Sequence, residues 1–215
     1  MEELKPVETQ STAKKVLTAL REAIFTGKLQ PGQRITQTNL AKQLNVSITP
    51  VREALMTLET EQLVKLVAHK ETIILGVNRK YLEDYYNTRS VLEEYLIKLV
   101  CSEGVDITKI ERAYKKMELI VKQKNYDEYN TANSEFHNAI HEAAGNNFIA
   151  NFLSRISISI SAAKNTSLEK YVEISFNEHK RLIKYIREHD SENAVNEVHN
   201  HMMRSLEDIL TYYPQ

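Results

Sequence analysis

Residues 35–55 read ITQTNLAKQLNVSITPVREAL and predict two short helices joined by a tight turn. Thr36 has a side chain suited to capping the first helix, in which apolar residues recur at helical spacing. Thr49 stands where an N-cap belongs, and Pro50 follows at the first helical position, where its missing N–H costs nothing. One apolar face of the second helix is expected to be buried, formed by Val51, Leu55 and Leu58.

This pattern is typical of a helix-turn-helix, which lays its second helix in the major groove of DNA with the N-terminal residues foremost. Arg52 lies in the first turn of that helix, and the hydroxyl groups of Ser47 and Thr49 precede it. Guanidinium and hydroxyl groups suit phosphate oxygens and base edges. An ordinary helical hairpin with a surface Arg fits the same residues. The choice between this hairpin and a DNA-binding helix-turn-helix therefore depends on the flanking segments.

The flanking segments favour the DNA-binding interpretation. Upstream, a helix that starts near residue 12 is expected to end at Gly27. Downstream, residues 63–67 and 72–75 are short runs rich in β-branched and aliphatic side chains, which predict a hairpin. A helix, a helix-turn-helix and a two-stranded wing together make a winged helix. We therefore predict a winged helix-turn-helix domain over residues 1–77.

The remainder of the chain, residues 78–215, shows no further strand pattern and is expected to be helical throughout. Short polar breaks divide it into six predicted helices, near residues 79–102, 106–123, 126–144, 147–164, 168–188 and 191–211. The expected fold is mostly α, with the winged helix-turn-helix followed by an all-helical bundle. Bundles place ligand and metal sites in the core between facing helices.

Histidines in the predicted bundle are candidates for a metal site. Asn133 and His137 lie one turn apart on one helix, so both side chains can reach the same point. His179 and His201 belong to the last two helices. Imidazoles with an oxygen ligand suit a divalent ion such as Zn, Ni or Mn. Surface or hydrogen-bonded histidines would show the same pattern.

The N-terminal part resembles the GntR regulators of bacteria. Gly27–Gly32 has the form Gly-x-Leu-x-Pro-Gly, and Val46–Leu55 reads VSITPVREAL, which matches the specific decapeptide of that family. Three positions depart from the family pattern. Ile48 replaces Arg, Gln62 replaces Gly before the first wing strand, and Glu71 lies near a wing tip where Gly is usual. These departures bear on the operator sequence more than on DNA binding itself.

The C-terminal part resembles the FCD domain of the FadR-like branch of this family. The resemblance rests on Glu135–His137, on Glu178–His179, and on the spacing between His179 and His201 in the last helix. It implies a metal ion held by Asn133, His137, His179 and His201. The family has Asp where this chain has Asn133, and an amide oxygen brings no negative charge, so affinity for a hard cation should fall.

Arg89–Glu93, which reads RSVLE, matches another FCD landmark. The resemblance implies that the Arg89 guanidinium meets the carboxylate of a small organic acid, the effector. The alternative is that Arg89 pairs with Glu93 at i+4 and steadies the helix.

The resemblance further implies a homodimer that binds an inverted repeat of double-stranded DNA. Binding of the small metabolite to the helical domain is expected to modulate binding of the operator. The residues expected at the DNA are Thr38, Ser47, Ile48, Thr49, Pro50, Arg52, His69 and Lys70.

Bulk composition is compatible with this hypothesis. The net charge is −1, so the whole molecule is no general polyanion binder. The single Cys101 excludes an internal disulfide and suits a reducing cytosol. Apolar runs fall short of the roughly 18 residues that a membrane span needs, and the first residues lack the order of a secretory signal. We therefore expect a cytoplasmic protein without a membrane partner.

Two other functions compete with an effector-controlled regulator. A metal-dependent enzyme built on the helical bundle would use Glu-x-x-His on facing helices, and no Glu in this chain has a His three residues later. We therefore expect no enzyme and no catalytic residues. A regulator that has lost its effector site and responds to a partner protein is the other alternative, because Asn133 replaces Asp.

Overall fold

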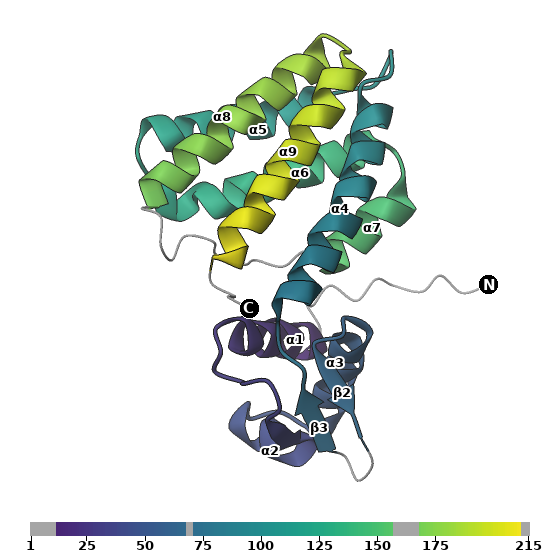
Figure 1. The fold of residues 1–215 in the computed structure, drawn as a ribbon, viewed down its shortest axis with the longest axis vertical. Coiled ribbons are helices and arrows are strands. Elements are labelled where there is room, and N and C mark those ends of the chain that lie inside the picture. The colour runs from purple at the N-terminus through teal and green to yellow at the C-terminus, as the bar shows by residue number, and fades with distance from the viewer. Residues whose placement is uncertain (1–11, 68–70, 157–167, 212–215) are drawn as a thin grey trace, which may run out of the picture. The chain divides into compact units, whose positions relative to one another are not determined.

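A computed structural model describes residues 12–67, 71–156 and 168–211. The chain divides into two compact units, Met1–Asn78 and Arg79–Gln215 (Figure 1). The first combines helices with a small sheet and the second is helical in its described part, which confirms the predicted mostly α fold. None of the helices in these ranges is both long and apolar enough to cross a membrane.

The first unit is a winged helix. Its elements are α1 (Thr12–Phe25), β1 (Arg34–Thr36), α2 (Gln37–Gln43), α3 (Ile48–Thr60), β2 (Val64–Leu66) and β3 (Glu71–Ile74). The strands form one antiparallel sheet in the order β1-β3-β2, in which Ile35 lies opposite Thr72 and Lys65 opposite Ile73. The hairpin of β2 and β3 was predicted and β1 was not, because a three-residue strand shows too little alternation to be recognised.

Helices α1 and α3 pack against each other and form the core of this unit. The predicted buried face of α3 is confirmed, since Val51, Leu55 and Leu58 are at most 1% exposed. The side chains that α1 buries are Val16, Leu20 and Ile24. The exposed face of α3 is therefore available to a partner outside the unit.

The two predicted helix caps had different outcomes. Thr36 caps α2 as expected, and its Oγ1 accepts a hydrogen bond of 3.2 Å from the backbone N–H of Asn39. Thr49 is not the cap of α3, which begins at Ile48 after an extended Ser47 whose side chain makes no capping bond. Pro50 still lies in the first turn, where backbone N–H groups have no partner within the helix, so it tolerates the earlier start.

Gln62 has a φ of 58°, in the left-handed region that favours glycine. It is the residue at which the family resemblance expects Gly, so the backbone keeps the conformation although the side chain has changed. A left-handed conformation costs a residue with a Cβ about 1–2 kcal/mol. Asn45, in the turn between α2 and α3, has a φ of 51°, and Asn tolerates this region better than Gln does.

The second unit contains the six predicted helices within a few residues of their expected bounds. They are α4 (Arg79–Val100), α5 (Thr108–Lys122), α6 (Tyr129–Ala143), α7 (Asn147–Ile156), α8 (Leu168–Arg187) and α9 (Ser191–Leu210). A short 3-10 turn, η2 (Tyr126–Glu128), precedes α6 and takes up the first residues expected in that helix. The predicted extension of α7 to residue 164 falls outside the described residues.

Helix α9 packs against both α4 and α8, and α5 packs against α6 and α8 (Figure 1). Apolar side chains from these helices fill the interior, among them Ile97, Met117, Phe136 and Val198. A set of polar side chains is buried in the same unit, consisting of Ser90, Glu93, His137, His141, Ser175, Glu178, His179 and His201. Buried polar groups need partners. These residues are therefore the candidates for a functional site in the helical unit.

Candidate metal centre and nucleic-acid interface

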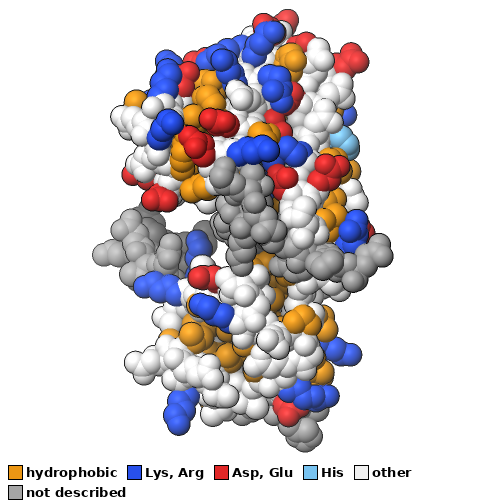
Figure 2. Space-filling model, turned by 60° about the vertical axis from the view of Figure 1, so that its left-hand side comes forward, with side chains coloured by type: hydrophobic (Ala, Val, Ile, Leu, Met, Phe, Trp, Pro, Cys, Tyr) orange, Lys and Arg blue, Asp and Glu red, His pale blue; other side chains and the backbone are white. Residues whose placement is uncertain are grey.

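The first turn of α3 lies at the surface of the winged helix. Of the residues expected at the DNA, Pro50 is half-buried and the others that the structure describes are exposed, namely Thr38, Ser47, Ile48, Thr49 and Arg52. Arg52 makes no ion pair with the described part of the chain. His69 and Lys70 lie outside the described residues. In Figure 2, Lys and Arg side chains are more prominent than Asp and Glu on the displayed face of this unit.

Glu71, the acid near the wing tip, is paired. Its carboxylate lies 3.0 Å from Nη1 of Arg34, which stands on the neighbouring strand β1. Both side chains are exposed, and such a surface pair contributes about 0–1 kcal/mol to stability. The pairing offsets part of the negative charge that Glu71 would otherwise present to a DNA phosphate.

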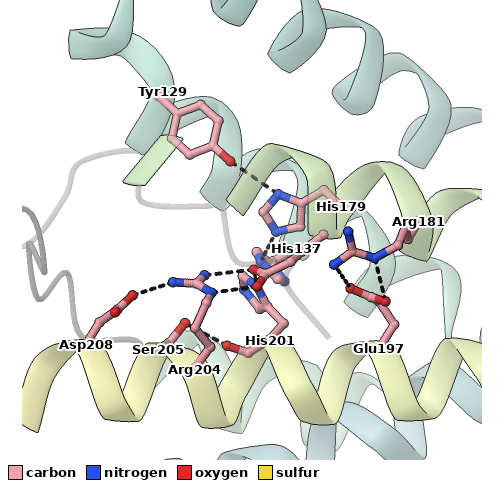
Figure 3. A network of polar contacts seen from close by, with 10 residues as sticks. Tyr129, His137, His179, Arg181, Glu197, His201, Arg204, Ser205 and Asp208 are labelled. Carbon is pink, nitrogen blue, oxygen red and sulfur yellow. Dashed lines mark hydrogen bonds and ion pairs between the residues drawn. The ribbon is translucent and has the colours of Figure 1, made fainter. Parts of the chain in front are cut away.

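Three histidines converge in the core of the helical unit. His137 comes from α6, His179 from α8 and His201 from α9, and each is at most 6% exposed. Nε2 of His137 and Nε2 of His179 lie 3.2 Å apart. One ligand nitrogen from each of the three residues falls within 4.8 Å of the others, so the group could hold a metal ion. Figure 3 shows the three rings gathered between their helices.

Neighbouring side chains hold two of these rings through Nδ1. The hydroxyl of Tyr129 lies 3.3 Å from Nδ1 of His179. Nδ1 of His201 donates to Oε2 of Glu178 at 2.6 Å. A carboxylate only accepts hydrogen bonds, so Nδ1 of His201 carries a proton and Nε2 is the ring nitrogen that Glu178 does not engage. Outer contacts of this kind orient histidines that bind metals.

Glu178 is itself held by Arg204, one turn beyond His201 on α9. Nε and Nη2 of Arg204 donate to the two carboxylate oxygens at 2.6 and 2.8 Å, and Arg204 also pairs with Asp208 (Figure 3). Although burial opposes it, hydrogen bonds from His201 and Arg204 lower the pKa of the Glu178 carboxyl below 4.5. Glu178 is therefore an anion at neutral pH, and hydrogen bonds from His201 and Arg204 hold its carboxylate in place.

Burial controls the charge of the other two histidines. Removal from water, together with the positive potential of neighbouring side chains, lowers the pKa of His137 and His179 well below 6.5. Both imidazoles are therefore neutral at physiological pH. Neutral imidazole is the form that binds metal ions.

The oxygen donor predicted for this cluster is Asn133. It stands one turn before His137 on α6, which places both side chains on the same side of the helix. Its Oδ1 is buried and has no hydrogen-bond partner in the described structure. A buried acceptor without a partner is costly, and a cation beside the three imidazoles would satisfy it. The donor set therefore fits a divalent metal ion.

Arg89 forms the i+4 ion pair with Glu93 that the sequence offered as the alternative to effector binding. Its Nε donates to Oε1 of Glu93 at 3.1 Å, and its Nη1 donates to the hydroxyl of Tyr85 at 3.2 Å. The other carboxylate oxygen of Glu93 lies 2.8 Å from Nε2 of His141. His141 is thus engaged by α4 and stands outside the group of three histidines.

Three residues of this centre were missed from the sequence as contributors, namely Tyr129, Glu178 and Arg204. Glu178 was noticed only as part of the Glu178–His179 landmark. The position of Arg204 one turn after His201 is the signal that could have marked it, but its contact with Glu178 depends on how α8 packs against α9.

Comparison with known proteins agrees with both units. The family of bacterial regulatory proteins of the gntR type matches residues 12–74, and the FCD domain matches residues 84–204. The helix-turn-helix transcriptional regulator YdhC of Bacillus subtilis (strain 168) is 28% identical over 193 residues, which cover 87% of this chain and 86% of YdhC. The gluconate operon transcriptional repressor of Bacillus licheniformis is 27% identical over 141 residues, 65% of this chain and 58% of that protein.

The solved structure of McbR/YncC from E. coli superimposes with a TM-score of 0.71, covering 96% of this chain and 100% of that one at 19% identity, and so has the same fold. The families and relatives are transcriptional regulators, which rules out the enzyme alternative. From the matched domains we conclude that this chain belongs to the GntR family of bacterial transcriptional regulators and carries an FCD domain.

Proposed function

We propose that this chain is a dimeric, cytoplasmic repressor or activator whose operator binding is modulated by a small carboxylate. Residues 1–77 bind the half-sites of an inverted repeat, and residues 78–215 bind the effector and form the dimer. The observation that carries the effector role is the buried group of His137, His179 and His201, together with the Oδ1 of Asn133, which lacks a hydrogen-bond partner among the described residues. Effector coupling of this kind is typically worth about 1–3 kcal/mol, enough to fill or vacate an operator.

The role of α3 in DNA binding rests on its exposed first turn. Arg52 presents a guanidinium that no described acid neutralises, and exposed hydroxyl groups of Ser47 and Thr49 stand beside it. Its opposite face is fixed in the core through α1. A rigid helix with donors on its free side suits the major groove.

The proposed ligands of the metal ion are His137, His179, His201 and Asn133, with Zn, Ni or Mn as the candidate ions. Such an ion supplies a positive charge to which an organic acid can bind. The contribution of the chain is to keep two imidazoles neutral, to orient His201 through Glu178, and to exclude water from the group.

Arg89 is the proposed partner of the effector carboxylate. Its guanidinium has five N–H donors, and the hydrogen bonds to Tyr85 and Glu93 use one donor each on Nη1 and Nε. The planar fork retains donors for a second carboxylate while the first two partners hold it in place. Glu93 thus positions Arg89, and the i+4 pair and effector binding are compatible.

Exposed apolar side chains support dimerisation by the helical unit. Val91 and Tyr95 are exposed on α4, and Phe148 and Phe152 are exposed on α7, with Phe148 the most exposed of them at 84%. Exposed apolar side chains of this kind are candidates for contact with a second copy of the chain. A second copy of the chain is the partner that the two-fold symmetry of an inverted repeat requires.

Arg52→Ala is expected to lower affinity for the operator about 10-fold or more, because it removes a guanidinium from the groove-facing turn. The operator is first selected from a random pool of duplexes with the full-length protein, and affinity is then measured by gel shift. Arg112→Ala, an exposed change on α5, is the matched control and should bind as the wild type does. Unchanged affinity of the Arg52 variant, with an unchanged circular dichroism spectrum, would refute its role.

Glu178→Gln is expected to weaken zinc binding about 10-fold or more, because the charged acceptor that orients His201 is lost. Competition with a chromophoric chelator measures the affinity directly. Glu197→Gln is the matched control, since Glu197 pairs with Arg181 across the same two helices without touching a histidine. Equal zinc affinity in the wild type and both folded variants would contradict the assignment.

Acidification is expected to destabilise the metal-free protein. The pKa of His137 and His179 is lowered in the folded state, so below about pH 6.5 the unfolded chain binds protons that the folded chain does not. Their contribution is complete above that pH, and up to about 1.4 kcal/mol per histidine is lost for each pH unit below it.

Urea unfolding at several pH values, followed by tyrosine fluorescence, measures this dependence. His137→Gln should flatten it, whereas His189→Gln, at an exposed residue after α8, should not. Stability that stays constant or rises on acidification would argue against two buried neutral imidazoles.

A further inference from the structure

Ile48 is a branched apolar side chain at the first position of α3, next in sequence to the exposed hydroxyl groups of Ser47 and Thr49. It is 40% exposed. In the described part of the winged helix, the other large apolar side chains with comparable exposure are Met56, also on α3, and Leu75 after β3. Two of these three residues therefore lie on the helix that enters the major groove.

The fold gives no reason for Ile at this position. A helix start is often fixed by an apolar contact between the residue before the N-cap and the fourth helical residue. With Ser47 as N-cap, those positions belong to Val46 and Val51, and Val51 is fully buried. Ile is also a weaker helix former than most polar residues with straight side chains. Exposure and propensity would both favour a polar residue here.

We propose that Ile48 packs against the 5-methyl group of a thymine, so that each operator half-site carries thymine at the position facing the start of α3. This inference rests on the DNA-binding role proposed above. An aliphatic side chain has no hydrogen-bond donor or acceptor, and the apolar group that base pairs present in the major groove is the thymine methyl. Residues at the N-terminus of the second helix are those that reach base edges.

The same chemistry selects against guanine. An Arg at this position would donate to O6 and N7 of guanine, whereas Ile48 would cover those acceptors without bonding to them. Leaving polar groups desolvated and unpaired costs free energy. Ile48 stands where the family pattern has Arg. We therefore expect the preferred base at this position to be thymine, whereas an Arg would prefer guanine.

Arg52 fixes where this thymine lies in the half-site. Ile48 and Arg52 are four residues apart on α3, so their side chains are neighbours on one side of the helix. The thymine is therefore expected next to the base or phosphate that Arg52 contacts.

Selection of duplexes from a random pool tests the base preference. The full-length wild type is expected to enrich inverted repeats with thymine at one position in each half-site. Ile48→Arg is expected to enrich guanine at that position and to keep the remaining positions of the half-site. Guanine at that position with the wild type, or no change of base with Ile48→Arg, would overturn the proposal.

Replacement of the selected thymine by uracil tests the contact itself, because it removes the methyl group and leaves base pairing unchanged. The wild type should lose about four-fold in affinity per half-site, the value of one buried methyl group. Ile48→Ala should bind both duplexes nearly equally. Leu75→Ala, the matched change at an exposed aliphatic residue outside α3, should keep the full uracil penalty.

A wild type that tolerates uracil, or an equal uracil penalty in Ile48→Ala, would refute the methyl contact while DNA binding itself stands. Enrichment of no duplex at all would instead refute the DNA-binding function, and with it this inference. The two failures are therefore distinguishable.

Discussion

The burial of three imidazole rings between α6, α8 and α9 is a strong constraint on the helical unit. His137, His179 and His201 are removed from water, and burial of a polar group without a partner costs about 1–3 kcal/mol. The surroundings meet this cost for His179 and His201 through Tyr129 and Glu178. Beside the three imidazoles lies the Oδ1 of Asn133, which has no hydrogen-bond partner among the described residues, and a cation bound there would satisfy it.

A buried network of charged and polar side chains lies at α4. Glu93 accepts from Arg89 on its own helix and contacts His141 of α6, so one carboxylate links the landmark of the first FCD helix to the helix that carries His137. In the same way Glu178 of α8 ties His201 to Arg204 of α9. Removing one member of such a buried pair is strongly destabilising. Glu93 therefore holds Arg89 and His141 in place, and Glu178 does the same for His201 and Arg204.

Local patterns in the sequence predicted most of the fold. Apolar periodicity identified the buried face of α3, and short polar breaks divided the FCD unit into its six helices. The three-residue strand β1 was missed, and the N-cap of α3 was placed at Thr49 instead of Ser47. Both errors concern segments of only a few residues, in which the sequence signal is weak.

The candidate site was predictable only in part. The resemblance to FCD domains pointed to the three histidines that the structure brings together, and to Asn133 beside them. The roles of Glu178, Arg204 and Tyr129 depend on the packing of α8 against α9 and α6, which no local pattern encodes. The pairing of Arg89 with Glu93 was foreseen as an alternative because a spacing of four residues is readable in sequence.

The most direct test of the account is X-ray absorption spectroscopy at the zinc edge on the full-length protein loaded with one equivalent of zinc. We expect a shell of three imidazole nitrogens at about 2.0–2.1 Å together with oxygen donors. Failure of the protein to retain zinc, or a shell with fewer than three imidazoles, would contradict the claim that His137, His179 and His201 form a metal centre.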